Sequence, residues 1–250
     1  MHRFYLPPDQ CNQPTLTLAE REAHHALHVL RLREGEHAAV LDGLGHEYHC
    51  EVAQTTPDTV ELSVLQKNSI APLPYQITLL QAIPKGKLME FIVQKATELG
   101  AHRIVPILSE RVVPHLDAES NKLEKWHQAA IEAIKQSGLA WLPQVEAPVG
   151  LKEYLNRGEK FDLPLIASLR SDSRHPREVF QTFHAERHRL PQSVAIWVGP
   201  EGDFAPAEMN AIRAAGALPI TLGRVILRTE TAALYCLSIL NYELQAPQPG

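Results

Sequence analysis

The chain has few cysteines and no long hydrophobic run. Cys11, Cys50 and Cys236 are odd in number, far apart and without C-x-x-C spacing, which argues against a disulfide framework and a cysteine-bound zinc site. No uninterrupted apolar stretch approaches the roughly 20 residues of a membrane helix, and residues 1–8 contain no signal-peptide core. We therefore expect a cytoplasmic protein with no membrane partner.

Several familiar ligand-binding signatures are absent as well. The lysines and glycine of residues 84–87 lack the spacing of a phosphate-binding P-loop, and Tyr48 stands where a dinucleotide fingerprint beginning at Gly43 needs its third glycine. There is no G-x-S-x-G motif. His24 and His28 are four residues apart, but the glutamate and third ligand of a zincin helix are missing. No metal site is predicted.

Composition indicates a soluble globular protein. Of 250 residues, 44% are hydrophobic and 21% are charged, which fits one large or two smaller domains with a real core. A net charge of −5 argues against non-specific coating of nucleic acid. A local basic face remains compatible with it, because phosphate affinity depends on where lysine and arginine lie.

Two domains are expected, residues 1–71 and 75–250. Residues 69–74 contain two prolines at alternate positions, which favour extended backbone and disfavour helix. Before this boundary, residues 17–20 have the pattern of a capping box that opens a short helix, and strands are predicted at 38–41, 48–54 and 59–65. The first domain should therefore be a small, mostly β unit resembling a barrel.

Beyond the boundary, strand-like and helix-like segments alternate. Strands are predicted at 77–83, 104–108, 163–169, 194–198 and 218–222, and helices at 88–99, 120–137, 206–215 and 231–244. Such alternation is typical of a parallel sheet with helices on both faces. The expected fold class is therefore α/β.

Two apolar strands of this domain are followed by glycine-bearing loops, at 198–204 and 222–232. In open α/β sheets, ligands bind at the carboxyl ends of the strands, so the two loops predict one pocket. Glu201, Asp203, Arg228 and Glu230 follow the loops. On residue types alone, these charges fit a ligand site or a salt-bridged set of helix caps about equally, since Glu230 is favoured near a helix start by the macrodipole.

The last helix is apolar nearly all round, since only Ser238 is polar between Ala232 and Leu240. A helix of this kind must be buried on all sides. Either a single core or a homodimer interface would bury it, and the terminal position favours the homodimer.

Taken together, several motifs in order resemble the ribosomal RNA small subunit methyltransferase E family, which belongs to the SPOUT class of RNA methyltransferases. They are VLRLR at 29–33, QKATELG at 94–100, SER at 109–111, VGPEG at 198–202, LG at 222–223 and ILRTETA at 226–232. The resemblance covers nearly the whole chain.

The resemblance implies an enzyme that uses S-adenosyl-L-methionine to methylate N3 of a uridine in small-subunit (16S) ribosomal RNA. It implies a PUA-like RNA-binding barrel, a C-terminal SPOUT domain with a trefoil knot, and a homodimer through that domain. Backbone groups of 199–202 and 222–227 would read the adenine. The cofactor-binding residues would be Leu169, Gly199, Pro200, Glu201, Gly202, Leu222, Gly223, Ile226 and Leu227.

Methyl transfer to a uracil imide needs charge stabilisation and a proton acceptor. Arg228 is the candidate for stabilising charge on the uracil oxygens, and Glu230 or Glu201 is the candidate proton acceptor if burial raises its pKa. The candidate phosphate contacts to RNA are Arg3, Arg31, Arg33, Lys85 and Lys87. For each of these five residues, an ordinary solvent-exposed charge is as good an explanation as a phosphate contact.

The chain departs from the family pattern at Arg224 and Val225, where the cation is shifted by one position, at 139–142 (LAWL), where arginines are usual, and at Asp203, where a second glycine is frequent. Two alternatives therefore stay open. One is a catalytically weak or inactive ribosome-associated RNA-binding protein of the same fold. The other is a SPOUT methyltransferase acting on another RNA position.

Overall fold

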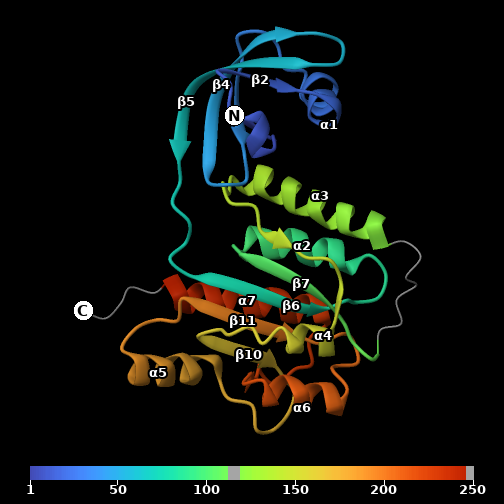
Figure 1. Ribbon diagram of the computed structural model, residues 1–250, viewed down its shortest axis with the longest axis vertical. Helices are drawn as coiled ribbons and strands as arrows, with labels where there is room; N and C mark the ends of the chain where they lie inside the picture. The colour runs from blue at the N-terminus through green and yellow to red at the C-terminus, as the bar shows by residue number, and fades with distance from the viewer. Residues whose placement is uncertain (112–118, 246–250) are drawn as a thin grey trace. The chain divides into compact units, whose positions relative to one another are not determined.

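The computed structural model describes residues 1–111 and 119–245 (Figure 1). They form two compact units. The first comprises residues 1–72 and 131–142, and the second comprises the rest of the described chain. Helix α3 (Glu119–Ser137) contributes residues to both units. Across the described residues, no helix is long and apolar enough to cross a membrane.

The first unit is built on a five-stranded mixed sheet in the order β1-β3-β4-β5-β2. Strands β1 and β3 are parallel, and the other neighbours are antiparallel. The predicted strands are confirmed as β3 (His37–Leu41), β4 (His46–Thr55) and β5 (Val60–Ser69). The two outer strands, β1 (His2–Tyr5) and β2 (Thr15–Leu18), were not predicted.

The predicted capping box is wrong, although the helix after it exists. Thr17 lies within β2, opposite Glu61 of β5, because Leu16 and Leu18 alternate into the core and are fully buried. Helix α1 (Glu20–His24) begins after Ala19, which makes no side-chain cap bond. It continues as a π-helical turn, η2 (His25–Val29).

The second unit contains a parallel sheet in the order β12-β10-β11-β6-β7-β8, with β9 also paired to β7. All these pairs are parallel, as predicted from the strand–helix alternation. The strands are β6 (Gln76–Ala82), β7 (Arg103–Leu108), β8 (Gln144–Val145), β9 (Val149–Gly150), β10 (Leu163–Ala167), β11 (Ser193–Val198) and β12 (Leu218–Ile220).

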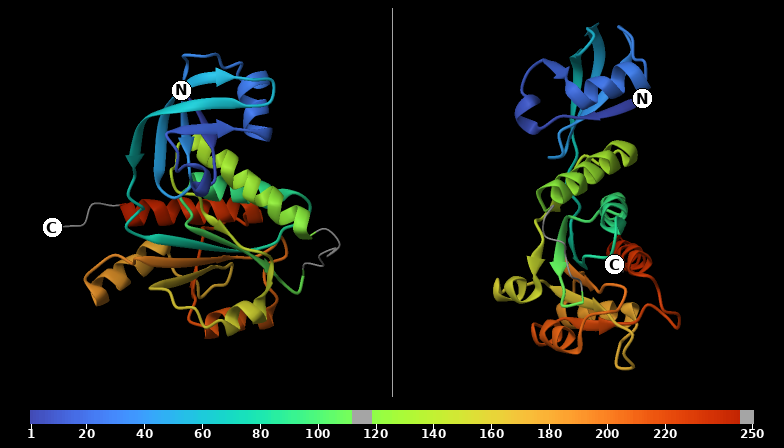
Figure 2. Two further views of the ribbon diagram at one scale, coloured as in Figure 1. Left: turned by 45° about the horizontal axis from the view of Figure 1, so that its top comes forward. Right: turned by 90° about the vertical axis from the view of Figure 1, so that its right-hand side faces the viewer.

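Helices cover both faces of this sheet, which explains why its strands are apolar almost throughout (Figure 2). Helices α2 (Leu88–Glu98) and α7 (Thr229–Gln245) pack side by side on one face. Helices α4 (Leu151–Asn156) and α6 (Pro206–Ala214) share a core with the other face. Helix α5 (Pro176–Arg187) packs against α7.

Helix α7 is not buried on all sides by its own chain. Cys236, Leu237 and Leu240 are buried against the core, whereas Tyr235 exposes 47% of its surface and Ser238 is exposed. Burial of this helix in a single core is therefore wrong for the isolated chain, and the side with Tyr235 and Ser238 faces outward.

Candidate functional site

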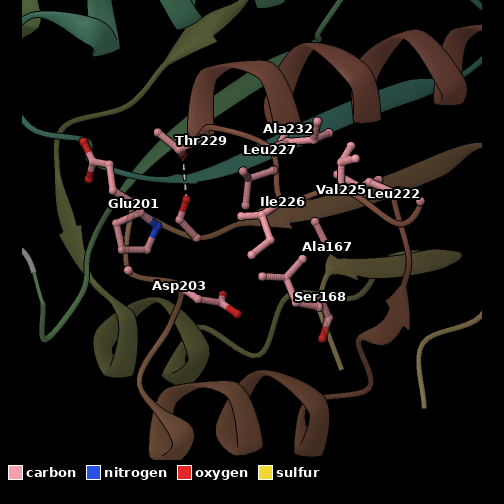
Figure 3. Close-up of a pocket in the computed structure, with 16 residues that line it drawn as sticks. Ala167, Ser168, Glu201, Asp203, Leu222, Val225, Ile226, Leu227, Thr229 and Ala232 are labelled. Carbon is pink, nitrogen blue, oxygen red and sulfur yellow. Dashed lines mark hydrogen bonds between the residues drawn. The ribbon is translucent and has the colours of Figure 1, made fainter. Parts of the chain in front are cut away.

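A pocket of about 300 Å³ lies where β10, β11 and β12 end and α7 begins (Figure 3). Its wall comes from residues 167–169 after β10, residues 198–203 after β11, and residues between 222 and 232. The carboxyl ends of parallel strands meet at one edge of a sheet, so three loops distant in sequence converge here.

All nine residues predicted to bind the cofactor line this pocket. They are Leu169, Gly199, Pro200, Glu201, Gly202, Leu222, Gly223, Ile226 and Leu227. The structure therefore brings the predicted set together. Ser168, Asp203, Thr229 and Ala232 also line the pocket and were not among the predicted cofactor-binding residues.

The first loop folds tightly on itself at Gly199. A Cβ there would lie 2.8 Å from Asp203 Oδ1 and 3.2 Å from the backbone nitrogen of Phe204. Asp203 has a φ of +61°, and its Oδ1 accepts a hydrogen bond of 2.8 Å from that same nitrogen. Glycine at 199 is thus required by the loop's own conformation, before any ligand is considered.

Within the described chain, one segment of the second loop leaves its peptide groups without partners. Gly223 has a φ of +109°, a conformation that L side chains rarely adopt, and its N–H donates to Thr221 Oγ1 at 3.2 Å. Within the described chain, no hydrogen bond uses the backbone groups of Val225, Ile226 or Leu227. These groups line or border the pocket and are available to a ligand.

Apolar side chains at the pocket are unusually exposed. Leu169, Val225 and Ile226 expose 62%, 65% and 82% of their surfaces. Three large apolar side chains around one concave site indicate a surface that another molecule covers.

One hydrogen bond joins the two main loops. Thr229, the first residue of α7, donates from Oγ1 to the carbonyl oxygen of Gly199 at 2.6 Å, and this bond is drawn in Figure 3. Thr229 Oγ1 in turn accepts a bond of 3.0 Å from Gln81 Nε2 in β6. Gln81 was not predicted as a site residue, although an amide within a mostly apolar strand is a signal that sequence alone contains.

The predicted catalytic residues are only partly at the pocket. Glu201 lines it, but its side chain is exposed and Oε1 accepts a hydrogen bond of 3.0 Å from the backbone nitrogen of Lys85. Of the residues described, neither Arg228 nor Glu230 is in the pocket wall. Arg228 is exposed, and Glu230 borders a separate hollow between α2 and α7.

After β7, Arg111 contacts the first loop and Glu110 contacts helix α6, which follows that loop. An Nη1 donor of Arg111 bonds to the carbonyl oxygen of Gly202, and the backbone nitrogen of Glu110 donates to Glu208 Oε1 at 2.8 Å. Their contribution depends on contacts between distant segments, so sequence spacing alone did not predict it.

The five predicted phosphate contacts fall in different units. Arg31 and Arg33 are exposed in the first unit, and Arg3 lies in β1 with Nε 3.5 Å from Glu47 Oε1. Lys85 and Lys87 are exposed in the second unit, in the loop before α2. The residues described contain no group of three or more His, Cys, Asp or Glu side chains that could hold a metal.

A second polar cluster surrounds Arg103, the first residue of β7. Arg103 Nη2 donates to Tyr154 Oη at 3.0 Å and also bonds to Glu159. Arg157 Nη1 donates to Glu146 Oε2 at 2.7 Å, and Arg103 Nη1 lies 3.4 Å from Glu146 Oε1. Burial raises the pKa of the Tyr154 phenol above its usual value, so it stays protonated and donates to Glu159 Oε2 at 3.1 Å.

Comparison with known proteins identifies the family of the chain. A family profile described as an RNA methyltransferase domain matches residues 71–241, and an RNA methyltransferase PUA domain matches residues 18–65. The chain thus belongs to the class of RNA methyltransferases.

The similarity extends to individual proteins. The ribosomal RNA small subunit methyltransferase E of Bacillus subtilis is 33% identical over 93% of this chain and 91% of its own length. The corresponding Neisseria gonorrhoeae protein, solved bound to S-adenosyl methionine, is 31% identical with a TM-score of 0.85, covering 97% of each chain. A Legionella pneumophila methyltransferase solved with bound SAM has the same identity and TM-score over 96% of each chain. The chain belongs to the ribosomal RNA small subunit methyltransferase E family.

Proposed function

We propose that this protein methylates N3 of a uridine in small-subunit ribosomal RNA, with S-adenosylmethionine as methyl donor. The observation that supports the proposal most directly is the pocket, which gathers all nine predicted cofactor residues around unpaired peptide groups. The family membership and the cofactor in two similar structures support the same donor.

The pocket has the chemistry that an adenosyl group requires. An adenine edge needs hydrogen-bond donors and acceptors, which the free backbone groups of Val225, Ile226 and Leu227 can supply. Its flat faces need apolar contacts, which Leu169 and Leu222 can provide. The volume of about 300 Å³ is at the lower end of the range for small-molecule sites.

When bound, S-adenosylmethionine supplies a methyl group on a sulfonium. The sulfur–carbon bond breaks as a bond from carbon to uracil N3 forms, and the N3 proton must pass to a base. The chain has to align the base and stabilise the charge on its oxygens. We assign the second task to Arg228 and the proton to Glu230 or Glu201, all three of which are exposed or partly exposed in the single chain.

The outward positions of Arg228 and Glu230 are consistent with a site that a second copy completes. Glu230 borders the hollow between α2 and α7 that is lined by Leu88, Phe91, Leu234 and Tyr235. Phe91 and Tyr235 expose 42% and 47% of their surfaces. We therefore propose a homodimer through this face of the C-terminal domain, and sedimentation as a monomer only, at 27.9 kDa, would contradict it.

Recognition of RNA is assigned to basic residues of both units. Arg3, Arg31 and Arg33 belong to the PUA-like unit, and Lys85 and Lys87 to the methyltransferase unit. Contacts of this type position phosphates and weaken as salt is added.

The trefoil knot and the cytoplasmic location remain predictions.

The proposal is tested by incubating the purified protein with small ribosomal subunits and labelled S-adenosylmethionine, followed by nucleoside mass spectrometry. We expect N3-methyluridine as the labelled product. Another methylated nucleoside would assign the enzyme to a different RNA position. Cofactor binding without any transfer to subunits or to naked ribosomal RNA would instead favour an RNA-binding protein that has lost activity.

A further inference from the structure

Gln81 is a fully buried amide in a mostly apolar strand, where Thr78 is the other buried polar residue. It lies in β6 between Val198 of β11 and Pro106 of β7, and none of its surface is exposed. Burying an amide is costly unless it forms hydrogen bonds. Gln81 Nε2 donates to the carbonyl oxygen of Ala82 at 2.8 Å and to Thr229 Oγ1 at 3.0 Å. Since the carbonyl oxygen of Ala82 can only accept, the side-chain nitrogen of Gln81, rather than its oxygen, must face Ala82 and Thr229.

This amide fixes the direction of the next hydrogen bond. A threonine hydroxyl has a single proton and can rotate it toward any acceptor. Because Gln81 donates to Thr229 Oγ1, the hydroxyl proton is left for the carbonyl oxygen of Gly199, 2.6 Å away. Thr229 is itself only 4% exposed, so water offers it little competition.

The chain of bonds ends at the pocket. Gly199 begins the first loop, and Thr229 follows the unpaired segment 225–227 of the second loop. Within the described residues, no other hydrogen bond connects 199–203 with 222–229. One hydroxyl therefore makes the hydrogen bond between the two loops, and Gln81 orients that hydroxyl.

We propose that Gln81 and Thr229 are positioning residues that together hold the two loops at the spacing needed to bind S-adenosylmethionine. Neither residue has to touch the reacting atoms. The inference rests on the proposed function, because it names what sets the geometry of the same pocket.

Calorimetric titration with S-adenosylmethionine tests the proposal on four variants. Thr229→Val keeps the shape but removes the hydroxyl, and we expect the Kd to rise about tenfold, the equivalent of one buried hydrogen bond. Thr229→Ser keeps the hydroxyl and should remain within about twofold of wild type. Gln81→Met removes the orienting amide and should raise the Kd about fivefold. The double variant should be no weaker than Thr229→Val alone, since both changes break the same chain.

A matched control separates positioning from general damage. Thr97 is also a buried threonine of the second unit, 1% exposed, and its Oγ1 donates to the Val93 carbonyl within α2. Thr97→Val should lower the thermal midpoint as much as Thr229→Val while leaving the Kd unchanged. In methyl transfer, Thr229→Val should raise the KM for S-adenosylmethionine and leave kcat within about twofold.

The outcomes distinguish the two proposals. If wild type does not bind S-adenosylmethionine, the proposed function is wrong. If wild type binds but Thr229→Val binds equally well, or if the Gln81→Met and Thr229→Val losses simply add, the positioning role is wrong. Should Thr229→Val not fold, the comparison of Gln81→Met with Thr229→Ser decides, because only the former is expected to weaken binding.

Discussion

At the carboxyl ends of β10, β11 and β12, backbone groups of residues 225–227 have no partners among the described residues, and Ile226 exposes 82% of its surface. At the amino end of β7, by contrast, Arg103 is paired with Glu146, Glu159 and Tyr154. Both regions belong to the same sheet and contain polar groups in quantity. In the described chain, the pocket region leaves its peptide groups without partners, whereas the region around Arg103 pairs its charged groups with each other.

The difference separates binding from stability. Unpaired peptide groups and exposed apolar side chains stabilise nothing in the free protein, but a ligand that covers them gains both kinds of contact. Partly buried charges that are paired with each other contribute little to the affinity for a ligand. Removing one of them destabilises the fold, because its partners are left as uncompensated charges. Substitutions at the pocket should therefore change affinity, and substitutions around Arg103 should change the free energy of unfolding.

The largest expected effect is at the paired end. Arg103→Met removes the cation that Glu146, Glu159 and Tyr154 share, and Arg103 is only 18% exposed at its side chain. We expect the free energy of unfolding to fall by about 3 kcal/mol, with the Kd for S-adenosylmethionine unchanged. Denaturant unfolding and calorimetry measure the two quantities.

The control for this variant is Arg157→Met, whose side chain is 35% exposed and reaches the same glutamates. Its cost should stay below about 1 kcal/mol, since solvent screens a more exposed pair. An affinity loss in Arg103→Met comparable with its stability loss would contradict the separation of the two ends.

The next effect is at the pocket. Gly223 has a φ of +109° and open space around it, so Gly223→Val disturbs the backbone without creating a clash. A β-branched residue is strained in this region, and we expect the loop to rearrange and the Kd to rise about 30-fold, equivalent to about 2 kcal/mol.

Gly216 provides the matched glycine. It has a φ of +106°, is equally open, and follows α6 away from the pocket wall. Gly216→Val should lower the thermal midpoint about as much as Gly223→Val without changing the Kd. Equal affinity losses in both variants would mean that backbone strain acts globally.

A smaller effect is expected from Asp162, which precedes β10 at the paired end. Its hydrogen bonds with Arg189 lower the pKa of the carboxyl from 3.8 to about 2. A carboxylate with a lowered pKa in the folded state stabilises above its ordinary pKa and loses that contribution as pH falls toward the lowered value. Asp162→Asn should therefore cost about 1 kcal/mol at neutral pH and flatten the decline of stability between pH 4 and pH 2.

Arg189→Met should reproduce this flattening, because it removes the other half of the pair. Neither variant should alter the affinity for S-adenosylmethionine. Thermal unfolding as a function of pH measures the change in stability, and calorimetry measures the affinity for S-adenosylmethionine.

Local patterns in the sequence were sufficient to predict most of the sheet. Strands such as β10 and β11 are apolar on both faces, and the glycines of 199–202 and 222–223 indicate where the strands end in loops. Strand β2 was missed because Thr17 and Glu20 resemble a helix cap when read locally, while pairing with β5 decides the conformation of Thr17. Helix α5 was missed as well, since its sequence is largely polar outside the buried Val179, Phe180 and Phe183.

The site shows the same division between local and distant information. The predicted cofactor residues converge because each follows a strand of one parallel sheet, which a sequence can reveal. Thr229 and Gln81 meet across 148 positions of sequence, and Arg111 reaches Gly202 across 91. No local pattern encodes such contacts, so only the folded chain shows them. The roles of Arg228, Glu201 and Glu230 remain predictions.

Hydrogen exchange of the backbone amides, with and without S-adenosylmethionine, tests the difference between the two ends most directly. The amides of Val225, Ile226 and Leu227 form no hydrogen bonds in the described chain and should exchange rapidly in the free protein. Saturating cofactor should slow them by about tenfold or more, while exchange in residues 151–161 near Arg103 stays the same. Unchanged exchange at 225–227 in a protein that calorimetry shows to be saturated would contradict the account.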